Sequence, residues 1–510
     1  MPTRRQMLQW SAGFVAAPAV LRAQNAPAWK SDPFGLGVAS GAPSNDGFVL
    51  WTRMIGAEGD AALSVPYEIA TDESMRNVVR KGTATTEPVF GHSIHEEVAG
   101  LEPGRPYWYR FSSGSAESAL GRAMTLPAPG ADKLRFAYFS CSNWQAGYFS
   151  AYRHAAEEHP DFAVFLGDYI YEYIETRHPV VRAHSGGKEP RTVAEYRARY
   201  EQYRSDPDLR AIHAACPSLV TWDDHEVQND YADQWSEDFE DPQVFLSRRA
   251  SAYQAFYEHM PVKPKFSKPF GSEMRVYDSY DFGDLLRVNL IDGRQYRSRE
   301  ACYRKPDKGG GHAETAKSCP ELLDLRRSMI GEAQEKWLFN TFSTSKAQWN
   351  VIANDVLMAR LNQPAPDGEP QYWTDDWDGY PASRNRLLIS IHDHKPSNPV
   401  VITGDIHSFW TNDLKLDFAD EKSPVIATEL VGTSVSSDGP PYDVFSKFLP
   451  QNPHVKFFES RKRGYVSVAL TSKRMDAKYQ VVSDVIDSNA TLSTLAAFVV
   501  EDGKPGAQKT

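Results

Sequence analysis

The chain has 510 residues, of which 41% are hydrophobic and 12% aromatic, enough for a sizeable core and against wholesale disorder. Its 56 Lys+Arg and 67 Asp+Glu give a net charge of −11, which disfavours a sequence-independent nucleic-acid binder, and we expect no nucleic-acid-specific binding. At about 100–200 residues per domain, two or three domains are expected, and no apolar run reaches the roughly 18 residues that a lasting transmembrane helix needs.

The N-terminus predicts an export signal. Arg4 and Arg5 precede a short apolar run at 7–21, and small residues lead to a cleavage point after Ala23. This pattern is typical of a twin-arginine signal peptide, so we leave residues 1–23 out of the fold. We therefore expect the twin-arginine translocation machinery as a partner and a periplasmic or extracellular location.

The four cysteines are too few for a disulfide-framework protein. An oxidising destination would nevertheless let Cys302 and Cys319 pair across the glycine-rich segment at 308–311, and the alternative is that both stay reduced. Cys216, which precedes a proline, is most simply a small buried side chain.

Residues 32–126 predict an all-β domain. Strand-like segments at 48–53, 65–70, 93–98 and 107–112 are separated by turn residues, without an amphipathic helix of respectable length. A Pro-Gly turn before the aromatic strand in Leu101–Phe111 resembles the tyrosine corner of fibronectin type III and immunoglobulin-like sandwiches. Because 127–130 reads Pro-Ala-Pro-Gly, we place a linker and a domain boundary there.

Residues 133–500 predict an α/β domain whose sheets are covered by helices. Short apolar runs alternate here with stretches of helical spacing, at 148–158, 193–203, 247–259, 333–342 and 384–391.

Five of the apolar runs end in side chains that can carry chemistry. In α/β sheets, ligands bind beyond the carboxyl ends of the strands, so these ends converge on one site if the strands are neighbours. The five groups are Cys141 after 136–140, Asp168 and Tyr171 after 162–166, Asp223, Asp224 and His225 after 218–222, Asn354 and Asp355 after 349–353, and Asp405 and His407 after 399–403.

Such a convergence of carboxylates needs neutralising charge, because buried like charges repel and are costly to desolvate. Few arginines lie near these strand ends in the sequence, so metal cations are the simplest solution. Cys141, Tyr171 and His407 combine thiolate, phenolate and imidazole donors, which points to Fe3+ rather than zinc. The remaining groups are oxygen donors, which suit a hard cation, Ca2+ or Mg2+, with calcium more tolerant of irregular geometry. These donors are Asp168, Asp224 and Asp405, with Asn229 or Asn354 available, and Asp168 would bridge the two kinds of metal.

The order of these motifs resembles the metallophosphoesterase signature. The tyrosine three residues after Asp168 is similar to that of purple acid phosphatases. Cys141 in the first motif, Asp223-Asp224-His225-Glu226 in the third and Gly404-Asp405-Ile406-His407 in the last resemble PhoD-type alkaline phosphatases more narrowly. The resemblance covers essentially the whole chain, including the N-terminal segments FGLGVASGAP and VLWTRM and the export signal.

The resemblance implies a two-sheet α/β sandwich core, preceded by the immunoglobulin- or fibronectin-like β-domain. It also implies phosphomonoesterase and phosphodiesterase activity, through attack of a metal-activated hydroxide on phosphorus. Fe3+ would be held by Cys141, Asp168, Tyr171 and His407, and one or more Ca2+ by Asp168, Asp224 and Asp405, with Asn229 as an addition. The usual histidine of the fourth motif has no match near Asn354, so one coordination position is left open. Small phosphate esters, phospholipids or teichoic-acid-like polymers are the candidate substrates.

Three further features have two interpretations each. His225 either donates a proton in catalysis, beside Asp168 as the other catalytic residue, or orients a carboxylate ligand. Arg294 either contacts substrate phosphate or, as we favour, forms an ion pair at a strand end. The segment at 377–380 forms either a lid or a packed aromatic turn.

Three rivals to the phosphatase are considered. A phospholipase D-like phosphodiesterase could use the same metal core, and it would act on choline phospholipids but not on simple monoesters. A non-catalytic carbohydrate- or surface-binding protein should show gaps among the metal-type residues, and none is missing here. A redox iron protein would reduce its iron reversibly and lack esterase activity.

Overall fold

The computed structural model describes residues 29–510 apart from 58, 177–178, 264–270, 304–308 and 365–367. The predicted signal peptide at 1–23 lies outside the described residues. Within them, no helix is both long enough and apolar enough to cross a membrane.

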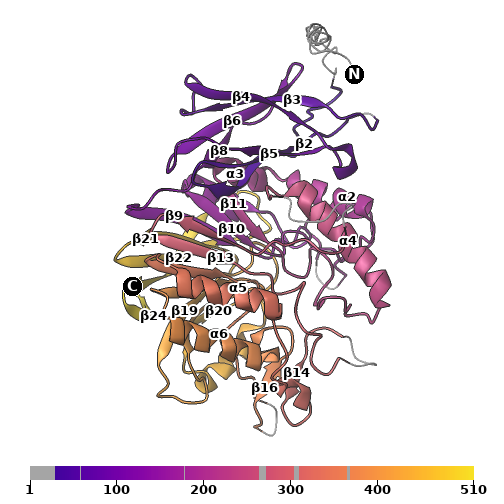
Figure 1. The fold of residues 1–510 in the computed structure, drawn as a ribbon. Coiled ribbons are helices and arrows are strands. Elements are labelled where there is room, and N and C mark those ends of the chain that lie inside the picture. The colour runs from indigo at the N-terminus through magenta and orange to yellow at the C-terminus, as the bar shows by residue number, and fades with distance from the viewer. Residues whose placement is uncertain (1–28, 58, 177–178, 264–270, 304–308, 365–367) are drawn as a thin grey trace, which may run out of the picture.

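The larger of two extensive sheets has ten strands (Figure 1). Neighbouring strands β9, β10 and β11 in its centre run parallel, while β21 to β24 form an antiparallel series at one end. In spatial order the strands are β24 (Lys504–Lys509), β23 (Leu492–Glu501), β22 (Arg474–Val482), β21 (Gly464–Thr471), β9 (Lys133–Phe139), β10 (Phe162–Leu166), β11 (Ser218–Thr221), β1 (Val38–Ser44), β2 (Gly47–Arg53) and β5 (Ser93–Val98).

The second large sheet has seven strands, and β13, β15, β17 and β19 run parallel at its centre. Its order is β12 (Asp278–Phe282), β13 (Leu286–Leu290), β15 (Trp349–Ala353), β17 (Pro399–Thr403), β19 (Val425–Val431), β18 (Phe409–Lys415) and β20 (Val455–Glu459).

The two sheets pack face to face over one hydrophobic core. Tyr138 and Val164 from the ten-stranded sheet share this core with Val351 and Ile402 from the seven-stranded sheet, and all four are nearly inaccessible. Central parallel strands are buried on both faces, which explains why their sequences read as continuous apolar runs.

Helices cover the outer faces of both sheets. Tyr152 of α1 and Tyr196 of α2 pack with Phe165 outside the ten-stranded sheet, and Leu338 of α5 and Leu387 of α6 lie in another core cluster with Ile352. The helices are α1 (Ser150–Glu157), α2 (Val193–Arg204), α3 (Pro207–Ala215), α4 (Pro242–His259), α5 (Gly331–Thr344), α6 (Pro381–His394) and α7 (Tyr442–Phe445), with 3-10 turns η1 (Pro88–Phe90), η2 (Pro320–Leu323), η3 (Trp377–Gly379) and η4 (Ser446–Gln451).

All five predicted helices are present, with ends that differ by a few residues. The largest difference is at α4, which begins at Pro242 rather than at residue 247. The Asp241 side chain accepts a hydrogen bond from the Gln243 amide, and Pro242 occupies the first helical position, where it sacrifices no intrahelical bond. The capping residues therefore set this boundary, and the apolar spacing alone misses it.

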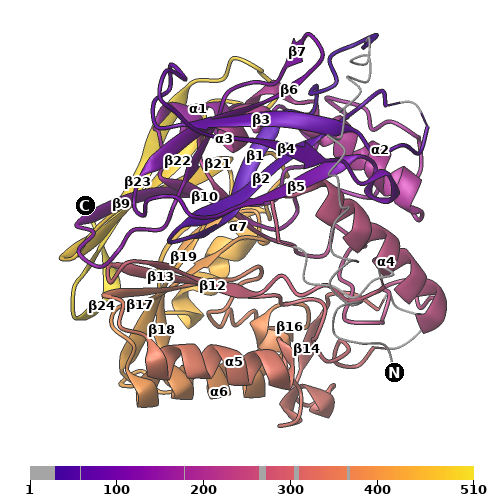
Figure 2. The same cartoon turned by 45° about the horizontal axis from the view of Figure 1, so that its top comes forward.

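The N-terminal strands form a small sheet that packs on the end of the ten-stranded sheet, at the opposite end of the molecule from α5 and α6 (Figures 1 and 2). Ile69 and Tyr109 of the small sheet share a core with Phe48 and Leu50 of β2. The small sheet contains β4 (Val78–Thr85), β3 (Ser64–Ala70), β6 (Pro106–Ser113) and β7 (Ala116–Glu117), and β8 (Gly121–Met124) pairs with β6.

The N-terminal β-structure is joined to the rest of the protein through a shared sheet. Strand β1 pairs in parallel with β11, at Gly41 and Ser218, so β1, β2 and β5 continue the ten-stranded sheet. A Cβ atom at Gly41 would lie 2.3 Å from the Pro261 carbonyl oxygen and 2.8 Å from that of Ser218. The sequence analysis placed these strands in a separate sandwich, because a pairing between β1 and β11 leaves no signal in either strand.

Two local predictions in these regions hold. Tyr107 Oη donates to the Glu102 carbonyl oxygen at 3.2 Å and accepts from the Glu102 amide at 2.9 Å, the hydrogen bonding of a tyrosine corner. Cys302 and Cys319 form a disulfide, with their Cα atoms 6.0 Å apart. The last two strands, β14 (Ala313–Thr315) and β16 (Gln371–Trp373), form a two-stranded antiparallel sheet beside this disulfide.

Candidate metal centre

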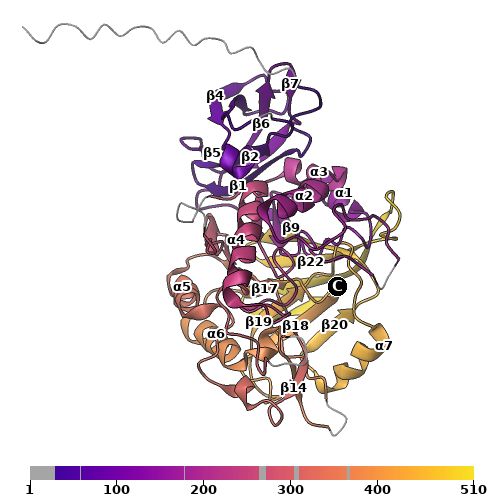
Figure 3. The same cartoon turned by 90° about the vertical axis from the view of Figure 1, so that its right-hand side faces the viewer.

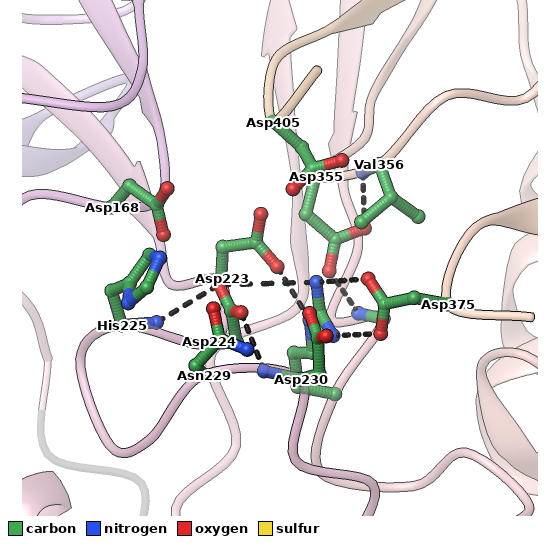
Figure 4. Close-up of polar contacts among 12 residues, drawn as sticks. Asp168, Asp223, Asp224, His225, Asn229, Asp230, Asp355, Val356, Asp375 and Asp405 are labelled. Carbon is green, nitrogen blue, oxygen red and sulfur yellow. Dashed lines mark hydrogen bonds and ion pairs between the residues drawn. The ribbon is translucent and has the colours of Figure 1, made fainter. Parts of the chain in front are cut away.

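The five strand ends do converge, although their strands belong to two sheets rather than one. β9, β10 and β11 bring Cys141, Asp168 and Asp224 from the ten-stranded sheet, and β17 brings Asp405 and His407 from the facing sheet. Figure 4 shows Asp168 opposite Asp405, with Asp223 between them and Asp224 below. The site therefore lies where the carboxyl ends of both parallel strand sets meet.

The backbone is unusual at four of the candidate ligands. Cys141, Asp168, Asp405 and His407 have φ angles of 61°, 54°, 61° and 53°. Residues other than glycine adopt this left-handed conformation at a cost of about 1 kcal/mol or more, and such residues cluster at functional sites. Each occurs directly beyond a strand end, so the sharp turn aims the side chain across the gap between the sheets.

Cys141, Asp168 and His407 have ligand atoms that all lie within 4.8 Å of one another. Tyr171 completes this group, because its hydroxyl donates to Asp168 Oδ2 at 2.8 Å and lies 3.1 Å from His407 Nε2. The other oxygen of this carboxylate, Asp168 Oδ1, is buried without a hydrogen-bond partner. A buried carboxylate oxygen is costly to leave unpaired, so its position beside thiol, phenol and imidazole fits a metal ion.

A second close group contains Asp168, Asp224 and His225, so Asp168 belongs to both groups. Asp405 belongs to neither of these groups of the described residues, and its side chain instead lines a pocket of about 360 Å³ together with Asn229 and Asp230. The Asn229 side-chain nitrogen donates to Glu237 Oε2 at 3.1 Å, which leaves the side-chain oxygen as the atom that could bind a cation. Asp168 lies where a bridging carboxylate is expected.

Asn354, the alternative oxygen donor, is excluded by its contacts. Its side-chain oxygen accepts from the Trp377 indole at 3.0 Å, and its amide donates to the Val356 carbonyl oxygen. The turn at 377–380 is fully buried, so it is the packed aromatic turn and does not form a lid.

Burial dominates the electrostatics of the carboxyl groups. It raises the pKa of Asp168 well above its usual range, helped by Asp224 and Glu226, and it does the same at Asp405, where Asp223 adds to the effect. Burial also opposes ionisation of Asp224, but His225 and Arg294 outweigh it and lower the pKa of that carboxyl. A multivalent cation would reverse this preference at Asp168 and Asp405, because it stabilises the ionised form.

The two histidines have opposite electrostatics. Burial, reinforced by Arg463, lowers the pKa of His407 to about 3, and its Nδ1 donates to the Asp438 carbonyl oxygen at 2.7 Å, which leaves Nε2 free as a ligand atom. Burial would lower the pKa of His225 too, but Asp224, Glu172 and Asp168 together raise it well above its usual value. These surroundings favour the protonated form of His225 and the neutral form of His407.

Glu172 is a site residue that the sequence analysis missed. Its Oε2 lies 2.7 Å from His225 Nδ1, and its Oε1 accepts a hydrogen bond from the backbone amide of Asn229 at 2.7 Å. The His225 ring stacks on the Tyr171 ring, with ring centres 4.1 Å apart. Glu172 directly follows Tyr171 in the sequence, and this position next to a candidate ligand is the one sequence feature that indicates a place in the site. The strand-end pattern itself predicts no function for Glu172.

An arginine-centred cluster lies beside the candidate ligands. Arg294 is fully buried; its Nε donates to Asp223 at 2.5 Å and its two terminal nitrogens donate to Asp375 at 2.5 and 2.9 Å. Arg297 binds the same Asp375 carboxylate at 2.8 Å. The ion-pair interpretation of Arg294 is therefore correct, and arginines neutralise part of the cluster although few lie near these strand ends in the sequence. Arg294 lies far from these strand ends in sequence, and folding brings it among them.

Comparisons with known proteins first define the class. Alkaline phosphatase D of Bacillus subtilis (strain 168) is 41% identical over 499 residues, which cover 95% of this chain and 83% of that protein. A solved structure described as the structure of PhoD superposes with a TM-score of 0.89 at 41% identity, covering 95% of this chain and 93% of the other. The protein is thus an enzyme of the alkaline phosphatase class.

The family follows from two sequence models. The model for PhoD-like phosphatase matches residues 136–479, and the model for the PhoD-like phosphatase N-terminal domain matches residues 19–127. The chain belongs to the PhoD-like phosphatase family.

Proposed function

We propose that this PhoD-like phosphatase is an exported, metal-dependent enzyme that hydrolyses both phosphomonoesters and phosphodiesters. The observation that carries the proposal is the convergence of Cys141, Asp168, Tyr171 and His407 around a buried carboxylate oxygen with no hydrogen-bond partner. No arginine bonds the Asp168 side chain, and the positive charge that the described residues place next to it is that of the His225 ring.

Fe3+ would be held by Cys141, Asp168, Tyr171 and His407, and Ca2+ by Asp168, Asp224, Asp405 and Asn229. The donor types support this division, since thiolate and phenolate suit a trivalent metal and oxygen donors suit calcium. When bound, such cations lower the pKa of a coordinated water and neutralise charge on the phosphoryl oxygens.

His225 is the group of the chain that moves a proton. Glu172 occupies Nδ1, so Nε2 is the nitrogen available to protonate the departing alkoxide. The negative charges of Glu172 and Asp224 keep the ring protonated before that step. Glu172 therefore fixes both the orientation and the protonation state of the proton donor.

Export through the twin-arginine machinery to the periplasm or cell exterior is proposed from Arg4, Arg5 and the apolar run that follows. The proposed organisation is a signal peptide at 1–23, an N-terminal β-domain at 32–126 and a catalytic domain at 133–500. Small phosphate esters, phospholipids and teichoic-acid-like polymers remain the proposed substrates.

The test combines metal analysis, an absorption spectrum and activity on protein purified without chelators. We expect iron and calcium, a phenolate-to-iron charge-transfer band that disappears in Tyr171→Phe, and turnover of both a monoester and a diester that stops on chelation. Zinc as the sole metal, or a spectrum untouched by Tyr171→Phe, would overturn the metal assignment. Activity on choline phospholipids without monoesterase activity would favour the phospholipase D-like alternative.

A further inference from the structure

The pocket of about 360 Å³ beside the candidate metal centre is lined by two chemically different kinds of residue. Asp230, Asp375, Asp376 and Asp405 are acidic, and His407 lines the pocket with them. Trp373, Ile406, Pro440 and Phe445 are apolar, and Asn229 and Gln363 complete the lining. The acidic residues belong to the site described above, and the apolar residues have no role in it.

Phe445 is rigidly supported. It ends the short helix α7 and packs edge-on against Phe448, with ring centres 5.5 Å apart, and against Trp410 at 6.5 Å. Tyr442 of the same helix stacks on Phe458 at 5.3 Å. The aromatic ring is thus held by its own cluster and does not need the pocket's contents to keep its place.

The segment that presents Phe445 is also the one that orients a candidate ligand. Asp438, seven residues earlier, accepts the hydrogen bond from His407 Nδ1. Pro440, between these two residues, lines the pocket itself. Phe445 therefore has a defined position relative to the candidate metal centre, because the stretch of chain that carries Phe445 also orients His407.

Trp373 lines the same pocket from a different element. It ends β16, opposite Ala313 of β14, and its side chain lies against Gly311, where a Cβ atom would be 2.9 Å from the indole nitrogen. Trp373 is nevertheless 38% exposed, although a large aromatic side chain gains most when it is covered. An exposed aromatic next to a catalytic pocket marks a surface that a ligand can cover.

We propose that Trp373 and Phe445 form a specificity wall that binds the alcohol part of the phosphate ester, and that the preferred alcohols are aromatic or otherwise flat and apolar. This inference rests on the proposed hydrolysis of phosphate esters at the same site, and it names the substrate class. The apolar lining residues Trp373, Ile406, Pro440 and Phe445 offer contact area to a flat apolar group, whereas the hydroxyl groups of a polyhydroxylated chain would lose hydrogen bonds to water against them.

The wall contacts the part of the substrate that does not react. Its contribution is the same in the ground state and the transition state, so it lowers KM and leaves kcat nearly unchanged. Loss of one aromatic contact corresponds to about a 3- to 10-fold loss of affinity, in the range measured for aromatic pairs.

The experiment compares phenyl phosphate with glycerol phosphate in the full-length, metal-loaded enzyme. For Trp373→Ala and Phe445→Ala we expect kcat/KM for phenyl phosphate to fall about 3- to 10-fold through KM, while that for glycerol phosphate changes less than about 2-fold. Each variant is compared with the wild type on the same ester, so the different reactivity of the two leaving groups cancels. Trp373→Phe should retain most of the phenyl phosphate activity.

Val444→Ala is the matched control, because Val444 is 46% exposed on the same short helix but does not line the pocket. Equal losses on both esters, a larger loss on glycerol phosphate, or no loss in either alanine variant with unchanged melting temperature and metal content would overturn the wall. Failure of the wild type to turn over either ester would instead overturn the proposed function, so the two failures are distinguishable.

Discussion

Two neighbouring groups of buried carboxylates in this protein solve the same electrostatic problem differently. In the arginine cluster, Asp223 and Asp375 are bonded by Arg294, and Arg297 adds a second guanidinium to Asp375. Around Asp168, the neighbours are a thiol, a phenol and two imidazoles, and one carboxylate oxygen is left without a partner. The arginine cluster contains its own guanidinium cations, although Asp223 Oδ2 is also left without a hydrogen-bond partner, whereas no arginine bonds the Asp168 side chain.

The difference separates residues that maintain the fold from residues that bind a ligand. A buried carboxylate paired with an arginine is part of a fixed ion-pair network, and removing one partner leaves an uncompensated charge. Burial raises the pKa of Asp168 and so disfavours its ionised form until a cation binds, and we expect its removal to affect binding more than folding. Substitutions in the two groups should therefore affect different measurements.

The largest effect is expected for Asp168→Asn. It removes the carboxylate shared by both close groups, and we expect metal content to fall and kcat/KM to drop by about 10³-fold, equivalent to about 4 kcal/mol of transition-state stabilisation. The free energy of unfolding of the metal-free protein should change by less than about 1 kcal/mol, because the neutral carboxyl and the amide are similar in size. A nearly unchanged kcat would remove Asp168 from the bridging position.

Arg294→Met should produce the reverse pattern. Without the guanidinium, Asp223 loses its bond from Arg294 and Asp375 keeps only Arg297, so we expect a loss of stability of about 3–5 kcal/mol by denaturant unfolding. The matched control is Arg287→Met, whose partner Asp281 is half exposed; there the loss should be below about 1 kcal/mol. If both variants lost the same stability, the arginine cluster would have no special part in the fold.

The smallest of the three effects is expected for Glu172→Gln, which alters the side chain that contacts His225 Nδ1. We expect kcat to fall about 10- to 100-fold, as for other residues that orient a ligand or proton donor. Glu172 is one of the charges that raise the pKa of His225, so its loss lowers that pKa. If His225 donates a proton, activity is lost as pH rises through its pKa, and the alkaline limb of the kcat profile should move to lower pH.

That pH profile also decides between the two interpretations of His225. A histidine that only orients a carboxylate would lose activity on Glu172→Gln without moving the alkaline limb. Glu189→Gln serves as the control, because Glu189 pairs with Arg248 rather than with His225 and should leave both kcat and the profile unchanged.

Much of this candidate site can be predicted from the sequence, because the strands that carry it have a recognisable pattern. Central parallel strands must be apolar on both faces, so they stand out as short runs, and the first polar residue after each run marks a carboxyl end. That regularity predicts Cys141, Asp168, Asp224 and Asp405 as candidate ligands, and the helical spacing of apolar residues between the runs predicts all five helices. The side chains that complete the site from elsewhere lack such a marker.

Arg294 shows why the remainder was not predictable. It follows β13 in sequence, yet its bonds reach Asp223 beyond β11 and Asp375 beyond β16, and only the packing of the two sheets brings these together. The pairing of β1 with β11 is hidden for the same reason, because the register of two distant strands depends on the whole sheet.

The shared sheet also constrains how the protein could be divided. Strands β1, β2 and β5 lie on the side of the N-terminal region that faces the rest of the protein (Figure 3). Cutting the chain near residue 130 would remove β1 from β11 and leave backbone amides and carbonyls of β11 unpaired, so that the edge strand of another molecule could bind to them. A side chain at position 41 would push the same two strands apart, since even a methyl group has no room against Pro261 and Ser218. The N-terminal strands thus act as a fixed cover for one margin of the catalytic sheet, and an engineered enzyme lacking them would be prone to self-association.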